Sequence, residues 1–215
     1  MENLLVINTS PQGSASYSRQ MTERFIRLWR HKHPSGNILY RELGNQPVPH
    51  ITEQWINAAF TPGEARSQAE RDVLALSDEL VKELQDATTI LIGCPMHNLS
   101  IPSTLKAYID QVVRMGLTTT LVPDRPHSPY VGLLENKKAY IMLVRGGYGY
   151  DKGGCYSQMN FQEPYLAAVL NMMGITQVET VTLEYAASND GRFDCSLERA
   201  KARIDAVLGG PAHKK

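Results

Sequence analysis

The sequence predicts an α/β fold, a doubly wound sheet of five parallel strands with helices on both faces. Five short apolar runs alternate with longer segments whose apolar residues repeat every three or four positions, which is the pattern of a parallel sheet with crossover helices. The runs are continuously apolar, as in strands that are covered on both faces. The length of 215 residues suits one such domain, so we expect residues 1–208 to form it and residues 209–215 to be a tail.

The elements can be placed in order along the chain. The first strand is expected at residues 4–7, and Ser16 or Ser18 then caps a helix. Its apolar residues recur at helical spacing: Met21, Phe25, Leu28 and Trp29. The other strands are expected at residues 38–43, 88–93, 138–144 and 177–184. The other helices are expected at residues 62–87, 103–113, 163–173 and 196–208.

The clearest helix is expected over residues 62–87, because one apolar stripe runs along it. The stripe consists of Ala65, Ala69, Val73, Leu76, Leu80 and Leu84. Two segments look irregular. Residues 44–62 hold three prolines and one expected helical turn near residues 53–59, and residues 116–130 hold Pro123, Pro126 and Pro129.

The composition narrows the choice of partners and compartment. Lys plus Arg number 22 and Asp plus Glu number 22, so no net charge favours nucleic acid or an acidic membrane, and a dedicated one-electron carrier would be more charged. Cys94, Cys155 and Cys195 are widely spaced and predict reduced thiols rather than disulfides or a metal site. No stretch resembles a membrane span or a signal peptide, so we expect a cytoplasmic protein.

A loop rich in hydroxyl groups, residues 9–18, joins the first strand to the first helix. Unpaired N–H groups and the positive end of the helix dipole favour an anion there, and serine hydroxyls add donors. Neither G-x-x-x-x-G-K-[ST] nor G-x-G-x-x-G is present, which argues against a nucleoside triphosphate and a tightly held dinucleotide. The loop therefore suits a phosphate monoester, although Ser and Gly could equally serve a plain strand-to-helix turn.

Three unusual loops follow the first, third and fourth strands: residues 9–18, 94–102 and 145–150. In a doubly wound sheet, ligands bind beyond the carboxyl ends of the strands where the strand order reverses. The second loop is made rigid by two prolines, and the third contains consecutive glycines that allow close backbone approach. We therefore expect the three loops to form one site.

These loops resemble those of the FMN-dependent NAD(P)H azoreductases, which belong with the flavodoxin-like quinone reductases. The resemblance rests on the serines of the first loop, on the Pro-Met-His-Asn block that begins at Pro95, and on Arg145-Gly146-Gly147. It covers nearly the whole chain. It implies a homodimer with one FMN per subunit at the dimer interface, and ping-pong hydride transfer from NADH or NADPH to a quinone or an azo compound.

The resemblance also implies the cofactor-binding residues. The FMN phosphate would be held by Ser10, Ser16, Tyr17 and Ser18. The flavin ring would be lined by Pro95, Met96, His97, Asn98 and Leu99, and faced at its pyrimidine end by the segment Val144, Arg145, Gly146 and Gly147. Family members usually have Tyr, Phe and Ser where this chain has His97, Leu99 and Val144. These changes preserve backbone contacts and affect ring stacking, redox potential and substrate choice.

Several roles stay open at the level of sequence. His97 is either a proton donor or, as we favour, a flat contact at the ring edge. Arg145 either stabilises negative charge on the flavin or pairs with a surface carboxylate. Cys94 fits a buried core residue better than a redox thiol. Tyr148 and Tyr150 either wall the substrate pocket or pack the loop.

The alternative functions are a flavodoxin-like electron carrier, an FMN reductase without azo or quinone activity, and a protein that uses the anion site for another phosphate ester. Residues 55–60 and 123–130 are candidates for the partner-subunit side of the pocket.

Overall fold

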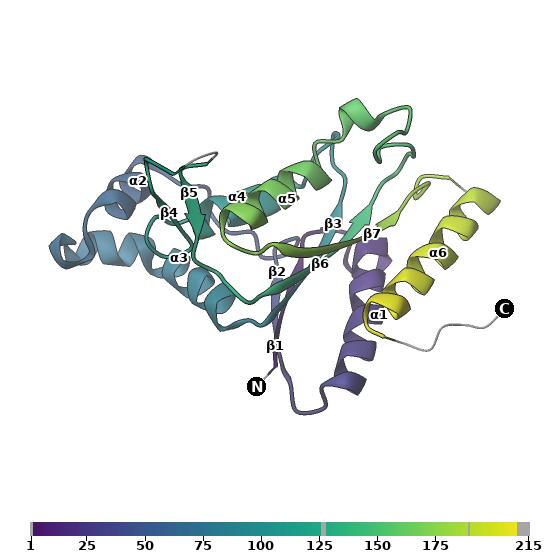
Figure 1. Ribbon diagram of the computed structural model, residues 1–215, viewed down its shortest axis with the longest axis horizontal. Coiled ribbons are helices and arrows are strands. Elements are labelled where there is room, and N and C mark those ends of the chain that lie inside the picture. The colour runs from purple at the N-terminus through teal and green to yellow at the C-terminus, as the bar shows by residue number, and fades with distance from the viewer. Residues whose placement is uncertain (1, 126–127, 189, 210–215) are drawn as a thin grey trace.

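The computed structural model describes residues 2–125, 128–188 and 190–209 and contains the expected parallel sheet (Figure 1). Its strands are β1 (Asn3–Asn8), β2 (Asn37–Glu42), β3 (Thr89–Pro95), β6 (Lys138–Val144) and β7 (Gln177–Leu183). They run parallel in the order β2-β1-β3-β6-β7. The order reverses direction at β1 and β3, which places the ligand crevice of such sheets beyond their carboxyl ends.

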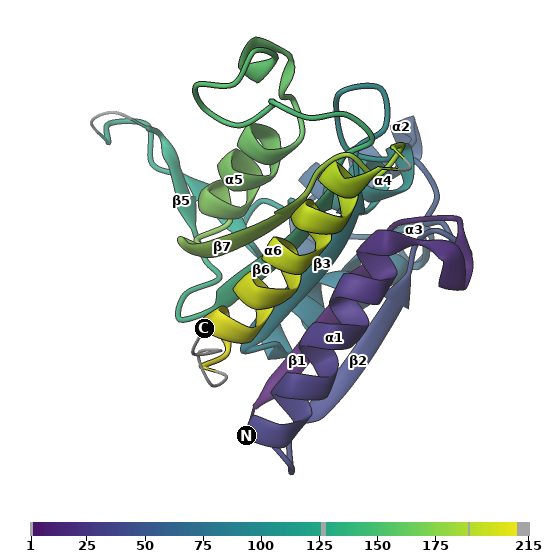
Figure 2. The ribbon, with the colours of Figure 1, turned by 90° about the vertical axis from the view of Figure 1, so that its right-hand side faces the viewer.

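Helices cover both faces of the sheet because alternate residues of each strand point to opposite sides. Leu5 and Ile7 join one apolar cluster with α3 (Gln68–Asp86), α4 (Ser103–Val112) and α5 (Glu163–Met172). Leu4 and Val6 join a second cluster with α1 (Tyr17–Lys32) and α6 (Gly191–Val207). Figure 2 shows α1 and α6 side by side on their face. The prediction of a doubly wound sheet is confirmed.

The helix predicted over residues 62–87 starts later than expected. A short 3₁₀ turn, Gly63–Ala65, is followed by Ser67, whose hydroxyl accepts a hydrogen bond from the Glu70 N–H while the Glu70 carboxylate accepts one from the Ser67 N–H. This capping box begins α3 at Gln68. The predicted stripe is also rotated: Val73 is 37 % exposed, and the buried face is Leu74, Ser77, Leu80, Val81 and Leu84.

The two segments expected to be irregular contain regular structure. The helical turn near residues 53–59 is confirmed as α2 (Glu53–Phe60), whose Trp55 is buried beneath the Arg114 guanidinium. In the second segment, β4 (Thr119–Leu121) pairs antiparallel with β5 (Tyr130–Gly132), which begins at the last residue of the segment. Because the segment between these strands is rich in proline, the sequence pattern does not indicate the hairpin.

The last helix begins before residue 196, which is where the sequence predicted its start. Asp190 caps α6 by accepting a hydrogen bond from the Arg192 N–H, so the helix begins at Gly191. Of the expected tail, residues 210–215 lie outside the described residues. Within the described part of the chain, no helix has the length and apolar character needed to span a membrane.

Candidate functional site

The three loops identified in the sequence leave the sheet from neighbouring strands at one edge. Beyond the end of β1, the Thr9 N–H donates to the Gly93 carbonyl of β3 over 3.2 Å. Beyond the end of β3, the Met96 N–H donates to the Val144 carbonyl of β6 over 2.7 Å. The loops after β1, β3 and β6 therefore start side by side at the carboxyl edge, as predicted.

The first loop presents a cluster of donors at the start of α1. The hydroxyls of Ser16 and Ser18 share a 3.0 Å hydrogen bond, and both side chains are buried. Ser16 caps the helix by accepting a hydrogen bond from the Arg19 N–H. The N–H groups of Tyr17 and Ser18 make no hydrogen bond with the described residues. Two hydroxyls and two free N–H groups thus meet at the positive end of the helix dipole.

The ring of Tyr17 belongs to the packing of the fold. It packs against Phe193 of α6 with 4.9 Å between ring centroids, so the backbone of Tyr17 is the part that faces the loop. Ser10 is buried, and its hydroxyl oxygen accepts a hydrogen bond from the Gln12 N–H. Among the described residues the Ser10 hydroxyl has no acceptor for its own proton.

An ion pair holds the first loop in place. Arg19 donates to the Gly13 carbonyl over 3.0 Å and pairs with Glu42 at the end of β2 over 2.5 Å. The Arg19 hydrogen bonds lower the pKa of Glu42 below its usual value. Because Glu42 neutralises Arg19, the charge offered to an anion comes from N–H groups rather than from a free cation.

The second loop forms a tight hairpin turn. The N–H of His97 donates to the Ser100 carbonyl over 2.9 Å, and the Ser100 N–H donates back over 3.0 Å. Asn98 and Leu99, the two residues between them, have φ angles of 48° and 71°. This is the pattern of a type I′ turn, in which Asn is tolerated and a leucine is strained. The side chains of His97 and Asn98 border a cavity of about 430 Å³.

The third loop directs its carbonyl groups away from the other two loops. The carbonyls of Gly146 and Gly147 accept hydrogen bonds from Ala187 and Tyr185 in the connection between β7 and α6. Their N–H groups make no hydrogen bond with the described residues, and both glycines are exposed. Two backbone donors are therefore available to a ligand at this edge.

The Arg145 side chain is fully buried and is held by carboxylate and amide partners. Its guanidinium pairs with Asp151 over 2.5 Å and with Glu163 over 3.2 Å, and it donates to the amide oxygen of Gln162. Of the two interpretations of Arg145, pairing with carboxylates is the one that the structure supports. Asp151 is largely exposed, as that interpretation expected.

Cys94 is a buried packing residue, and the tyrosines of the third loop make contacts with other rings and with Arg145. Burial raises the pKa of the Cys94 thiol to about 12, so the thiol stays protonated and unreactive near neutral pH. Tyr148 stacks on Tyr185 with 4.8 Å between ring centroids, and the Arg145 guanidinium lies 5.8 Å from the centroid of the Tyr150 ring.

Sequence reasoning missed Gln162, which lies just before α5 and is fully buried. Its amide N–H donates to the Cys94 carbonyl over 3.0 Å, and its amide oxygen accepts from Arg145 over 3.3 Å. Gln162 therefore connects the ends of β3 and β6. The only signal in the sequence was a glutamine immediately before a predicted helix, which is also typical of an exposed polar cap.

Known proteins resemble this chain along its length. Residues 2–208 match a family described by a flavodoxin-like fold. The FMN-dependent NAD(P)H:quinone oxidoreductase 1 of Pseudomonas aeruginosa is 41 % identical over 208 residues, covering 96 % of this chain and 98 % of that protein. An FMN-dependent NADH:quinone oxidoreductase of a Nostoc species is 40 % identical over 204 residues, covering 95 % and 97 %.

Solved structures share the fold. An azoreductase of Bacillus anthracis superposes with a TM-score of 0.86 at 23 % identity, covering 97 % of this chain and 99 % of that one. An FMN-dependent NADH-azoreductase of the same species, in complex with FMN, has a TM-score of 0.84 at 24 % identity, with coverage of 97 % and 98 %.

Proposed function

This chain belongs to the flavodoxin-like family of FMN-dependent NAD(P)H:quinone oxidoreductases, and we propose that it transfers hydride from NADH or NADPH to quinones or azo compounds in a ping-pong reaction. FMN, when bound, supplies the chemistry by accepting a hydride from the nicotinamide and passing it to the acceptor. The protein's task is to bind and orient the cofactor and both substrates.

The observation that carries this proposal is the pair of donor sets at one sheet edge. The hydroxyls of Ser16 and Ser18, with the N–H groups of Tyr17 and Ser18, suit the terminal phosphate of FMN. The N–H groups of Gly146 and Gly147 suit the carbonyl-rich pyrimidine end of its ring. Donors of two kinds, on loops of the same edge, match the two polar ends of one FMN molecule.

The turn after β3 supplies the remaining contacts. In our proposal Pro95, Met96 and the turn from His97 to Ser100 line the ring edge through their backbone. His97 and Leu99 replace the aromatic residues usual at these positions, so ring stacking is weaker than in relatives that have them. Val144 precedes the glycines and is buried, so it contributes through the backbone.

We further propose that two copies of the chain form the active unit in the cytoplasm. Large apolar side chains are exposed on the hairpin of β4 and β5 and on α2; these are Leu121, Tyr130 and Phe60. Phe60 is 73 % exposed, which favours burial against a partner. Sedimentation of the holoprotein should give twice the chain mass of 24.0 kDa.

An anaerobic titration tests the function directly. The absorption spectrum of the purified protein should show flavin bands that bleach on adding NADH or NADPH and return on adding a quinone. Bands that bleach with neither nucleotide would indicate an electron carrier. A protein that stays colourless after soaking in FMN would contradict the proposal and leave an anion site for another phosphate ester.

A further inference from the structure

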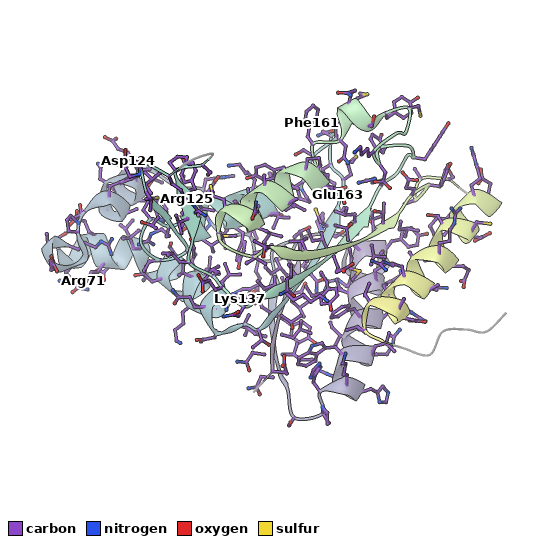
Figure 3. The ribbon with its side chains drawn as sticks, viewed as in Figure 1. Arg71, Asp124, Arg125, Lys137, Phe161 and Glu163 are labelled. Carbon is purple, nitrogen blue, oxygen red and sulfur yellow. The ribbon has the colours of Figure 1, made fainter. Side chains whose placement is uncertain are left out.

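Residues 160–163, which lead into α5 and include its first residue, contact both loops assigned above to the flavin ring. Figure 3 labels two of these residues, Phe161 and Glu163, at the amino-terminal end of α5. We propose that this segment, and Gln162 above all, is a positioning element that fixes the spacing of the two ring loops. The inference rests on the proposed function, because the ring is what these loops would hold.

Gln162 bridges the two loops at their roots. Its amide N–H donates to the carbonyl of Cys94, the residue before Pro95 and Met96, over 3.0 Å. Its amide oxygen accepts from the guanidinium of Arg145, the residue before the two glycines, over 3.3 Å. The side chain is 0 % exposed, so water cannot replace either bond.

The bridge lies where the sheet stops holding the loops together. The last backbone bond between the two strands is the one from the Met96 N–H to the Val144 carbonyl. Beyond it, the described backbone of the two loops makes no direct hydrogen bond between residues 97–100 and residues 145–150. Contacts with residues outside these two loops must therefore set the separation that a flat ring would require.

Phe161 holds the tip of the second loop through its backbone. Its N–H donates to the Leu99 carbonyl over 3.0 Å, and its carbonyl accepts from the Ser100 hydroxyl over 3.1 Å. Leu99 has a φ of 71°, which is costly for a leucine and persists only where the surroundings enforce it. The two bonds to Phe161 supply that enforcement.

The segment is itself anchored at both ends. The Asn160 side-chain oxygen accepts from the N–H groups of Gln162 and Glu163, and its amide donates to the Tyr150 carbonyl over 3.2 Å. Glu163 pairs with Arg145 and accepts a 3.0 Å hydrogen bond from Thr180 of β7. Gln162 thus connects both loops to this anchored segment, and in our proposal it fixes their positions without contacting the ring.

The decisive experiment compares Gln162→Met, which preserves side-chain length but removes both bonds, with Gln158→Met, an exposed glutamine of the preceding 3₁₀ turn Ser157–Met159. Each apoprotein is titrated with FMN and with riboflavin, which has the same ring and no phosphate. We expect Gln162→Met to weaken both ligands by about tenfold, the equivalent of one hydrogen bond, with their affinity ratio unchanged. Gln158→Met should bind both ligands as the wild type does.

The outcomes separate the inference from the function on which it rests. Failure of the wild type to bind FMN would overturn both. Wild-type binding with an unchanged affinity in folded Gln162→Met would overturn the inference alone, as would a loss confined to FMN. If Gln162→Met does not fold, Gln162→Asn replaces it, because its amide is one methylene too short to reach both partners. The same parallel loss is expected, and unchanged binding of both ligands would again overturn the inference.

Discussion

The hydroxyl oxygens of Ser16 and Ser18 lie 3.0 Å apart in the buried first turn of α1, beside the N–H groups of Tyr17 and Ser18, which make no hydrogen bond within the part of the chain that the structure describes. In the proposed complex these hydroxyls turn from each other to the FMN phosphate. A hydrogen bond to a charged group contributes about 1.5–3 kcal/mol, so each serine matters more to the cofactor than to the fold.

The double variant Ser16→Ala with Ser18→Ala should therefore lose at least roughly 100-fold in FMN affinity. Riboflavin affinity should stay close to wild type, because riboflavin carries no phosphate. The exposed Ser14→Ala of the same loop is the matched control and should change neither value. Loss of the Ser16 cap also costs about 1 kcal/mol of stability, so affinities must be measured below the unfolding transition. Unchanged FMN affinity in the double variant would remove the phosphate assignment.

Asn98 offers a test of the ring assignment. Its φ of 48° means that Asn98→Ala would strain the turn, whereas Asn98→Gly removes the amide and keeps the turn. If the amide contacts the ring, Asn98→Gly should shift the FMN midpoint potential by about 20–30 mV, the equivalent of one hydrogen bond in a two-electron couple. FMN affinity should change less. A potential and a rate of reduction equal to those of wild type would place Asn98 away from the ring.

Gly44 tests the support beneath the first loop. A Cβ atom at Gly44 would lie 2.1 Å from the Ser10 carbonyl oxygen, so the backbone of the loop would have to move. Gly44→Ala should lower the free energy of unfolding by about 1–3 kcal/mol and weaken FMN binding as well. Gly63→Ala meets nothing within 4 Å and is the control, expected within about 0.5 kcal/mol of wild type. Equal stability of the two variants in urea would contradict the close packing of Ser10 on Gly44.

The fold could be predicted because its physical signals are local. The interior residues of β1, β3 and β6 form continuous apolar runs, so each run predicts a strand buried on both faces. The start of α3 was less visible. Ala65, Ala69 and Val73 imitate an apolar stripe, and only the pairing of Ser67 with Glu70 decides where the helix begins.

The candidate site was predictable in part for the same reason. Its hydroxyl and glycine loops follow strands directly, and parallel strands bring such loops to one edge. Gln162 was hidden because its partners Cys94 and Arg145 lie 68 and 17 residues away, and no local pattern joins them. A buried polar bridge of this kind is visible only when the packing is known.

Acid should weaken the support of the first loop by protonating Glu42, which then loses its ion pair with Arg19. The hydrogen bonds from Arg19 lower the pKa of Glu42 in the folded state, so the unfolded chain binds the proton more readily. The stability that the ion pair contributes is therefore fully present above the ordinary glutamate pKa and is lost as the pH falls through the lower, folded value. FMN affinity should fall in the same window, because Arg19 fixes the Gly13 carbonyl of the loop.

Glu42→Gln isolates this effect. The amide oxygen of glutamine can still accept the hydrogen bond from Asn8, but the ion pair with Arg19 is gone. At neutral pH the variant should bind FMN more weakly than the wild type does. Its FMN affinity should not fall further as the pH drops through the range in which glutamate titrates. The control is Glu179→Gln, which breaks an exposed ion pair between Glu179 of β7 and Arg203 of α6. This variant should keep the wild-type dependence of FMN affinity on pH. A Glu42→Gln variant with the wild-type acid profile would show that another group titrates. FMN affinity measured by fluorescence quenching between pH 3 and pH 7 distinguishes these two outcomes. Loss of the acid dependence in Glu42→Gln would assign that dependence to the Glu42 carboxylate, which holds the first loop through Arg19.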